Sequence, residues 1–261
     1  MTYVDDKINK GRIDVCYLEG IMSIANILYK LTCFANYNDL DYNKEDVIKI
    51  LGAFDDPTIA PSVVSEIRVD GVVKQRMQFT AQNGLFSITI NSGRIDIQLT
   101  SNDKLGFVSD KLPEVRNYLV ESLAKLYTIF DSRAPIPHRL AWNTSYVYFE
   151  ISQDEKNAYR NKFLRELGFF KENRLEDTLI RYAGQREVTI SAEREKINVL
   201  ATINSYITDP GTEIEVNGFK IDYDINTWQG NRRNRFEVGS FSEFVERATE
   251  IQKALNEEIL P

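Results

Sequence analysis

The chain has 261 residues, of which 43% are hydrophobic, 11% are aromatic and 27% are charged, and its formal net charge is −7. These values are typical of a globular protein that buries a core, and they exclude a predominantly disordered chain. The acidic balance disfavours a surface that binds nucleic acid or anionic lipid throughout, because such a surface repels phosphate. Either function would need a local basic patch.

The first 34 residues are predicted to contain a strand at 12–18 and a helix from about 20 to 34. The chain lacks the basic start and apolar run of a signal peptide, and its most apolar early stretch, residues 21–34, is too short and too polar to span a bilayer. We therefore expect a cytoplasmic protein that does not contact a membrane. Its two cysteines, Cys16 and Cys33, do not form a CxxC pair, so we expect reduced thiols, no disulfide and no structural zinc.

Turn signals predict a four-stranded antiparallel meander over residues 64–100. Asp70-Gly71, Asn83-Gly84 and Ser92-Gly93 stand between runs of β-forming residues, and such dipeptides favour tight hairpins. A short helix at 44–51 precedes the meander. A longer helix over 115–130 follows it, with apolar residues at spacings of three and four and with Pro113 in its first turn.

The second half is predicted to repeat this order of elements. Its expected elements are a strand at 144–151, a helix from Ser152 to Leu167, strands at 179–182, 188–191, 197–203, 213–216 and 219–225 with a turn at Asn217-Gly218, and a last helix capped by Ser240 and Glu243. The fold class is therefore α+β, with two related halves at 1–131 and 139–261, joined by a linker at 132–138. Each half is an antiparallel β-meander with helices packed on one face. The near-equal offsets suggest an internal duplication, and the alternative is chance repetition of a common element order.

Most catalytic chemistry is excluded by what the sequence lacks. It contains no glycine-rich phosphate loop, no dinucleotide fingerprint and no nucleophile elbow, and with one histidine it cannot form a histidine-rich metal site. His138 could act as a base, but it lies in the predicted linker with no positioned partner, so a structural role is favoured. We predict no catalytic residue and no cofactor, and the preferred interpretation is that the protein is not an enzyme.

Asp222 and Asp224 are two residues apart on a predicted strand, so their side chains share one face. Paired carboxylates can hold Mg²⁺, which makes these two residues the one metal-binding alternative. A solvated strand face is the favoured interpretation, because charged side chains are mostly exposed.

The candidate binding site is the segment 228–236. It places Arg232, Arg233 and Arg235 between Trp228 and Phe236 in an otherwise acidic protein. Arginine binds carboxylate or phosphate in a bidentate manner, and the two aromatic rings could stack on a base or on a partner's side chain. The alternative is a charged loop that pairs with the protein's own acidic surface.

Three motifs in order along the chain resemble a known family. They are Phe79-x-x-x-Asn83-Gly84-x-Phe86-x-Ile88, then Arg139-Leu140, then Phe241-x-x-Phe244. This pattern resembles a large, sporadically distributed, uncharacterised prokaryotic family of about this length, over residues 60–260. The resemblance implies no reaction, and the scattered distribution suggests mobile or defence-linked genes.

The function expected from the sequence is that of a non-catalytic intracellular accessory protein that binds another protein in a prokaryotic antiviral-defence or toxin-immunity system. Exposed hairpin edges can extend the sheet of such a partner. The alternative is a protein that binds phosphate or nucleic acid through residues 228–236, including a metal-dependent hydrolase that uses Asp222 and Asp224.

Overall fold

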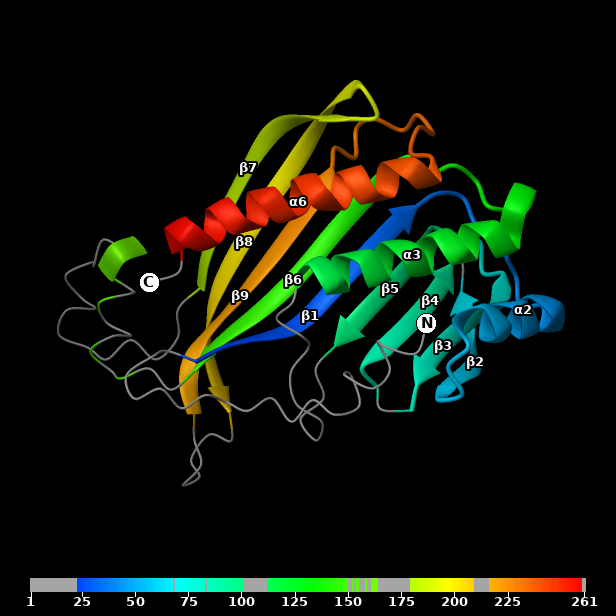
Figure 1. The fold of residues 1–261 in the computed structure, drawn as a ribbon, viewed down its shortest axis with the longest axis horizontal. Coiled ribbons are helices and arrows are strands. Elements are labelled where there is room, and N and C mark those ends of the chain that lie inside the picture. Colours follow the sequence, from blue (N-terminus) through cyan, green and yellow to red (C-terminus); the bar gives the residue numbers. More distant parts are fainter. Residues whose placement is uncertain are drawn as a thin grey trace.

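A computed structural model describes residues 23–67, 69–82, 84–100, 112–149, 179–208 and 216–259, together with residues 152, 154, 158 and 161–163. The fold is α+β, and nine strands of the described chain form one antiparallel sheet (Figure 1). The elements are β1 (Ser23–Phe34), α2 (Lys44–Phe54), β2 (Ile59–Ile67), β3 (Val73–Ala81), β4 (Phe86–Asn91), β5 (Arg94–Thr100), α3 (Leu112–Phe130), the 3-10 helix η1 (Asp131–Arg133), β6 (Arg139–Phe149), β7 (Leu179–Ile190), β8 (Glu193–Thr208), β9 (Val216–Thr227) and α6 (Val238–Ile259).

The strand order is β2-β3-β4-β5-β1-β6-β9-β8-β7. The central strands β1 and β6 pair with each other, with Leu31 opposite Trp142. Each also pairs on its other side with the last strand of its own meander, β1 with β5 and β6 with β9. Both halves therefore follow the same order from the centre outward, and the first half has one additional strand.

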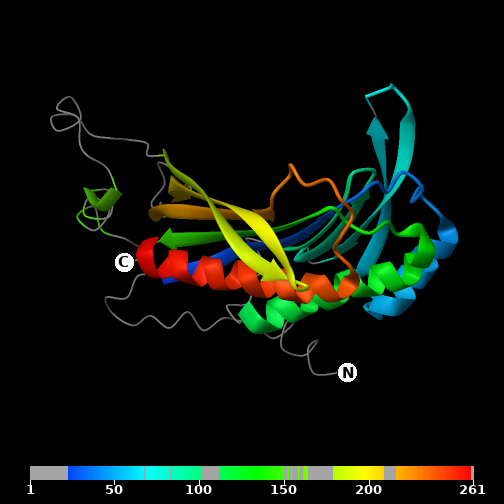
Figure 2. The ribbon, with the colours of Figure 1, turned by 90° about the horizontal axis from the view of Figure 1, so that it is seen from above.

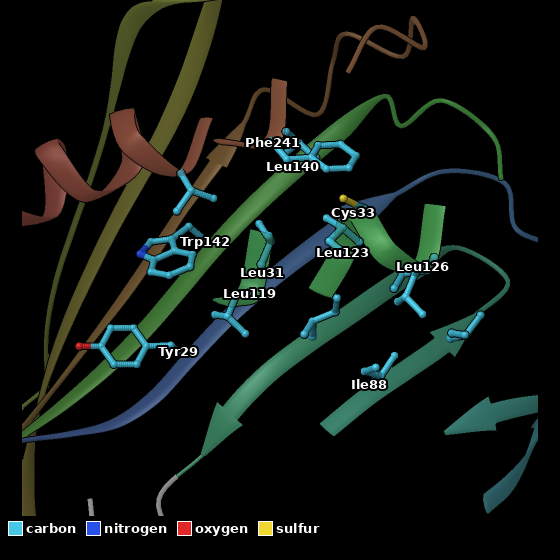
Figure 3. Packing of buried hydrophobic residues seen from close by; sticks show 14 of the residues in the cluster. Tyr29, Leu31, Cys33, Ile88, Leu119, Leu123, Leu126, Leu140, Trp142 and Phe241 are labelled. Carbon is cyan, nitrogen blue, oxygen red and sulfur yellow. The ribbon is translucent and has the colours of Figure 1, made fainter. Parts of the chain in front are cut away.

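Two helices pack against the sheet beside each other. Helix α3 contacts β1 and β5, helix α6 contacts β6, β7 and β9, and the two helices contact each other (Figures 1 and 2). Alternate residues of β1, namely Tyr29, Leu31 and Cys33, are buried in a cluster that also contains side chains of α3 and α6 (Figure 3). Burying each such apolar side chain stabilises the fold by roughly 1.5–3 kcal/mol. Trp142 of β6 joins the same cluster, and its indole N–H donates to Oε1 of Gln252 on α6 at 2.9 Å.

The meander of the first half and the helices on either side of it confirm the local predictions. The meander consists of the antiparallel strands β2 to β5, as the turn dipeptides indicate, and α3 begins at Leu112 with Pro113 in its first turn. Helix α2 begins where predicted, at Lys44, and Asn43 caps it by accepting the N–H of Glu45 at 2.8 Å. These elements depend on short-range signals, which the sequence carries locally.

The helix predicted over residues 20–34 is wrong, because Ser23–Phe34 forms β1. Ile24, Ile27, Leu28 and Leu31 do recur at helical spacing, but the buried residues Tyr29, Leu31 and Cys33 alternate with period two. Pairing with β5 on one side and β6 on the other satisfies the backbone of this segment, so the tertiary context decides between the two patterns. The strand predicted at 12–18 lies outside the described residues.

Several boundaries of the second half also differ from the prediction. Residues 179–190 form one strand, β7, instead of two, and β6 begins at Arg139, five residues before the predicted start. Asn217-Gly218 is not a turn, since Gly218 lies within β9 and pairs with both Phe149 and Tyr206. The helix predicted over 152–167 lies mostly outside the described residues, as does the connection 209–215.

The predicted capping box of the last helix does not form, because α6 begins at Val238 and Ser240 lies within its first turn. Its two residues instead bind the turn between β7 and β8. The hydroxyl of Ser240 hydrogen-bonds that of Ser191 at 2.9 Å, and Glu243 accepts the N–H of Ser191 at 2.6 Å. The sequence thus predicts correctly that Ser240 and Glu243 form hydrogen bonds, but their partner is Ser191 and not the start of their own helix.

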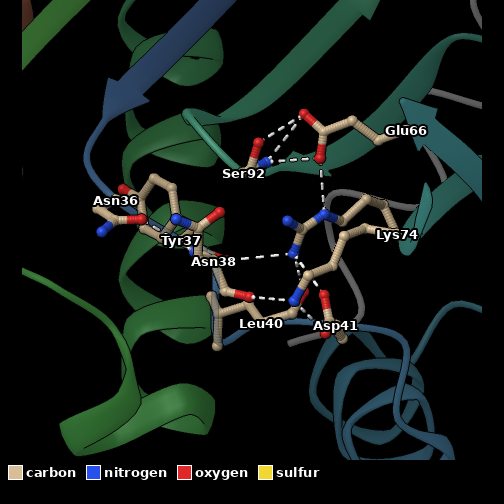
Figure 4. A network of polar contacts seen from close by, with 9 residues as sticks. Asn36, Tyr37, Asn38, Leu40, Asp41, Glu66, Lys74 and Ser92 are labelled. Carbon is tan, nitrogen blue, oxygen red and sulfur yellow. Dashed lines mark hydrogen bonds and ion pairs between the residues drawn. The ribbon is translucent and has the colours of Figure 1, made fainter. Parts of the chain in front are cut away.

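A buried arginine fixes the outer hairpin of the first half. Arg76 of β3 is fully buried; its Nε donates to Glu66 of β2 at 2.7 Å and its Nη1 to Asp41 at 2.9 Å (Figure 4). Its Nη1 also donates to the carbonyl oxygens of Tyr37 and Leu40. The network therefore joins β2, β3 and the loop after β1 through one cation.

Candidate anion-binding site

The predicted site, residues 228–236, forms the connection between β9 and α6. Backbone hydrogen bonds hold it at both ends. The N–H of Trp228 donates to the carbonyl of Lys196 at 2.8 Å, and the N–H groups of Arg235 and Phe236 donate to the carbonyl of Pro137 at 3.0 and 3.1 Å. The loop is thus attached to β8 and to the segment that enters β6.

Arg235 is directed to the protein's own carboxylate. Its side chain is only 4% exposed, and its Nε and Nη2 donate to the two oxygens of Glu195 on β8 at 2.5 and 2.9 Å. Its Nη1 donates to the carbonyl of His138. The guanidinium lies 4.3 Å from the ring centroid of Phe236, which is buried in the core. Arg235 and Phe236 therefore hold the loop in place.

Arg233 and Trp228 lie at the surface. Arg233 pairs with Glu193 at the start of β8, and both side chains are more than half exposed. The ring of Trp228 lies so close to Gly230 that a Cβ there would be 2.3 Å from a ring atom, so any larger residue at this position would displace the exposed ring. Lys196 lies 5.3 Å from the Trp228 ring centroid.

Arg232 is placed differently from its two neighbours. It is exposed and has no ion pair or hydrogen bond with any residue that the structure describes. Two open cavities adjoin the loop. The smaller one, of about 420 Å³, does not include Arg232. The larger one has a volume of about 920 Å³ and is lined by His138, Arg139, Gln229, Gly230 and Arg232. We call this larger one the cationic cavity.

Arg139, the first residue of β6, supplies the second guanidinium of the cationic cavity. It stacks on the ring of Phe34 at 3.9 Å from the centroid. Its Nε is buried and has no hydrogen-bond partner within the described chain. A donor of this kind is costly to leave unpaired, so an acceptor that reaches it would bind favourably.

The electrostatics of the cavity favour an anion. Burial lowers the pKa of His138 below its usual value, and the charges of Arg139, Arg235 and Arg232 lower it further, so the imidazole is neutral near pH 7. Burial also lowers the pKa of Arg139, Asp224 acts in the opposite direction, and Arg94 lowers it again. Positive charge therefore accumulates here even though the chain as a whole is acidic.

The sequence prediction located the loop but not the rest of the cavity. Of the three arginines it named, Arg232 lines the cavity, while Arg233 and Arg235 bind glutamates of β8. In the sequence, Arg139 stands out only as part of the resemblance motif, and the position of His138 in the predicted linker favours a structural role. Their approach to Arg232 depends on the pairing of distant strands, which no local pattern in the sequence reveals.

Asp222 and Asp224 share one face of β9, as their spacing indicates. Asp222 accepts the hydroxyl proton of Ser145 at 2.5 Å and pairs with Lys220 at 2.8 Å, and Asp224 accepts from the amide of Asn226 at 3.0 Å. Within the described residues, no group of three or more His, Cys, Asp or Glu side chains could hold a metal ion. Cys33 is a buried free thiol whose pKa is raised by burial and by Asp96, and Cys16 lies outside the described residues.

Comparisons with known proteins add no relative. No protein-family model matches the chain. Neither the curated proteins nor the solved structures contain a match to it. Among the described helices, none combines the length and the apolar character needed to cross a bilayer.

Proposed function

We propose that the protein is a non-catalytic binding protein that accepts acidic side chains of a protein partner in the cationic cavity. One observation carries this proposal. Two guanidinium groups, those of Arg139 and Arg232, line one open cavity without an ion pair to any residue that the structure describes, whereas Arg233 and Arg235 of the same loop bind glutamates of the protein itself. Carboxylates are the natural ligands for such unpaired guanidinium groups.

The charge around the cavity supports a short acidic segment over a nucleic acid. Asp222 and Asp224 lie on the neighbouring strand β9, and Asp224 is close enough to Arg139 to affect its pKa. A phosphate backbone that runs past the cavity would meet these carboxylates and a chain of net charge −7. One or two carboxylates of a partner can enter the cavity and avoid them.

A small phosphorylated ligand is the second candidate. The volume of about 920 Å³ is within the range of small-molecule sites, and arginine binds phosphate as readily as carboxylate. This candidate needs no extended anionic chain, so the nearby aspartates oppose it less than they oppose a nucleic acid.

The wider setting remains part of the proposal. We propose that the two halves, each a meander with helices on one face, arose by duplication, and their shared strand order supports this. We further propose that it acts in the cytoplasm as an accessory protein of an antiviral-defence or toxin-immunity system. The absence of signal-peptide features supports the location, and the family resemblance alone supports the defence setting.

The test is a calorimetric titration of the full chain with three probes: a glutamate-rich peptide, inorganic phosphate and single-stranded DNA. We expect the peptide to bind, and Arg232→Ala to weaken it roughly tenfold, as for the loss of a charge-assisted contact. Arg233→Ala is the matched control, because it removes the same charge from the same loop outside the cavity. Equal weakening by both variants would contradict the proposal, and binding of phosphate alone would favour the second candidate.

A further inference from the structure

The hairpin of β2 and β3 exposes an unusual amount of apolar surface. It projects from the sheet on the side opposite α3 and α6 (Figure 2). Val63 is 46% exposed, Ile67 is 76% exposed and Val73 is 61% exposed, and Val69 and Val72 are exposed near the tip. Exposed apolar side chains gathered on one element mark a surface that another molecule covers.

The outer strand of this hairpin also offers backbone groups that no other described strand pairs. β2 is the edge of the sheet. At its start, the N–H of Ile59 donates to the carbonyl of Asp56 instead of β3, so it points away from β3. Because the direction of N–H groups alternates along a strand, those of Val63, Ser65 and Ile67 point to the open edge. Pro61 occupies the same set of positions, where its missing donor leaves the pairing with β3 intact.

The two edges of the sheet, β7 and β2, differ in how well they are protected against pairing with another strand. β7 carries Arg181, Arg186 and Glu187, all exposed, and charges of this kind prevent edge strands from pairing. Glu66 is the only charged residue of β2, and Arg76 and Ser92 already bind it. Apart from Pro61 near its start, the β2 edge therefore carries no free charge or other feature that keeps strands from associating.

We propose that β2 pairs antiparallel with β2 of a second copy of this chain, about a twofold axis at Val64. In this register Val63 and Ser65 of one copy exchange backbone hydrogen bonds with Ser65 and Val63 of the other. Ile67 lies opposite Pro61, whose carbonyl can accept its N–H. The sheet then continues across both copies.

The residues of β2 suit a second copy as the occupant. In an antiparallel self-pairing about Val64, Glu66 lies opposite Ser62, so no like charges meet across the strands. Val63 and Ile67 of both copies fall on one face, where they cover each other. The interface is thus self-complementary, as a twofold contact must be. Since the remaining repulsion comes from two acidic chains, salt should strengthen this association, whereas it should weaken binding in the cationic cavity.

Two methods test the proposal: sedimentation measures the oligomeric state of the full chain, and cysteine cross-linking tests the register of β2 against β2. We expect a dimer with a dissociation constant below about 100 µM, and Ser65→Pro should abolish it by removing an outward N–H. In the non-hydrogen-bonded pair at the axis, the two Cα atoms lie about 4.5 Å apart, so Val64→Cys should form an intermolecular disulfide on oxidation.

Two controls keep the test decisive. Val73→Cys, on the inner strand of the same hairpin, should cross-link far less than Val64→Cys, and the wild type gives the background from the native cysteines. Val72→Lys changes the apolar tip without changing the edge backbone, so the dimer should persist. A monomeric wild type, or a dimer that survives Ser65→Pro, would overturn the proposal and leave the cationic cavity untouched.

Discussion

Two regions of the molecule use arginine in opposite ways. In the first half, Arg76 is fully buried and binds Glu66, Asp41 and two carbonyl groups. In the cationic cavity, Arg139 and Arg232 have no carboxylate within ion-pair distance among the described residues. An arginine that pairs with carboxylates of the protein itself stabilises the fold, whereas one without such a partner is available to bind a ligand. Its position in a charged segment does not distinguish the two roles.

The largest expected effect concerns Arg76. Arg76→Ala removes the cation that binds Glu66, Asp41 and two loop carbonyls, and breaking a buried charged network of this kind costs about 3 kcal/mol or more. Chemical denaturation measures the free energy of unfolding. Arg94→Ala is the control, because Arg94 pairs with Asp96 but is half exposed, and its loss should cost less than about 1 kcal/mol. Equal losses in the two variants would show that the Arg76 network does not hold the hairpin.

The pH dependence of stability tests the contribution of Glu66, the carboxylate partner of Arg76. Burial raises the pKa of Glu66, but the hydrogen bonds from Ser92 and Arg76 outweigh it, so the pKa lies below its usual value. A carboxylate with a lowered pKa stabilises the fold above its unfolded pKa of about 4.3, and the stabilisation is lost as the pH falls through the folded pKa. We therefore expect Glu66→Gln to be less stable than wild type at pH 7.

The difference between Glu66→Gln and wild type should then shrink as the pH falls below the unfolded value of about 4.3 and through the folded pKa, where Glu66 of the wild type becomes protonated. Unfolding by denaturant at pH 7, 5 and 3 measures it. A difference that stays constant over this range would mean that the charge of Glu66 does not contribute to the stability of the hairpin.

Within residues 228–236, replacing Arg235 should cost more stability than replacing Arg233. Arg235→Ala leaves Glu195, which is only 5% exposed, without its partner and should cost about 2–4 kcal/mol. Arg233→Ala removes an exposed pair and should change the free energy of unfolding by less than about 0.5 kcal/mol. Thermal or chemical denaturation of both variants measures the gap, and similar stabilities would contradict a structural role for Arg235.

The sequence predicts those parts of the fold that depend on neighbouring residues. Turn dipeptides and helical spacing locate β2 to β5 and α3 correctly. β1 is missed because its apolar residues fit a helix as well as a strand, and only its position between β5 and β6 decides. In the same way, the arginine loop is visible in the sequence, but Glu195 is 40 positions from Arg235 and the carbonyl of His138 is 97 positions away. Those contacts arise from strand pairing.

The most direct test of the account combines two measurements on one series of variants, Arg76→Ala, Arg235→Ala and Arg232→Ala. The free energy of unfolding and the affinity for the glutamate-rich peptide are determined for each. We predict that the first two variants lose stability, and that Arg232→Ala keeps the stability of the wild type within about 0.5 kcal/mol but loses affinity. An Arg232→Ala variant that binds the peptide as tightly as wild type, or that unfolds as easily as Arg235→Ala, would contradict the division between structural and binding arginines.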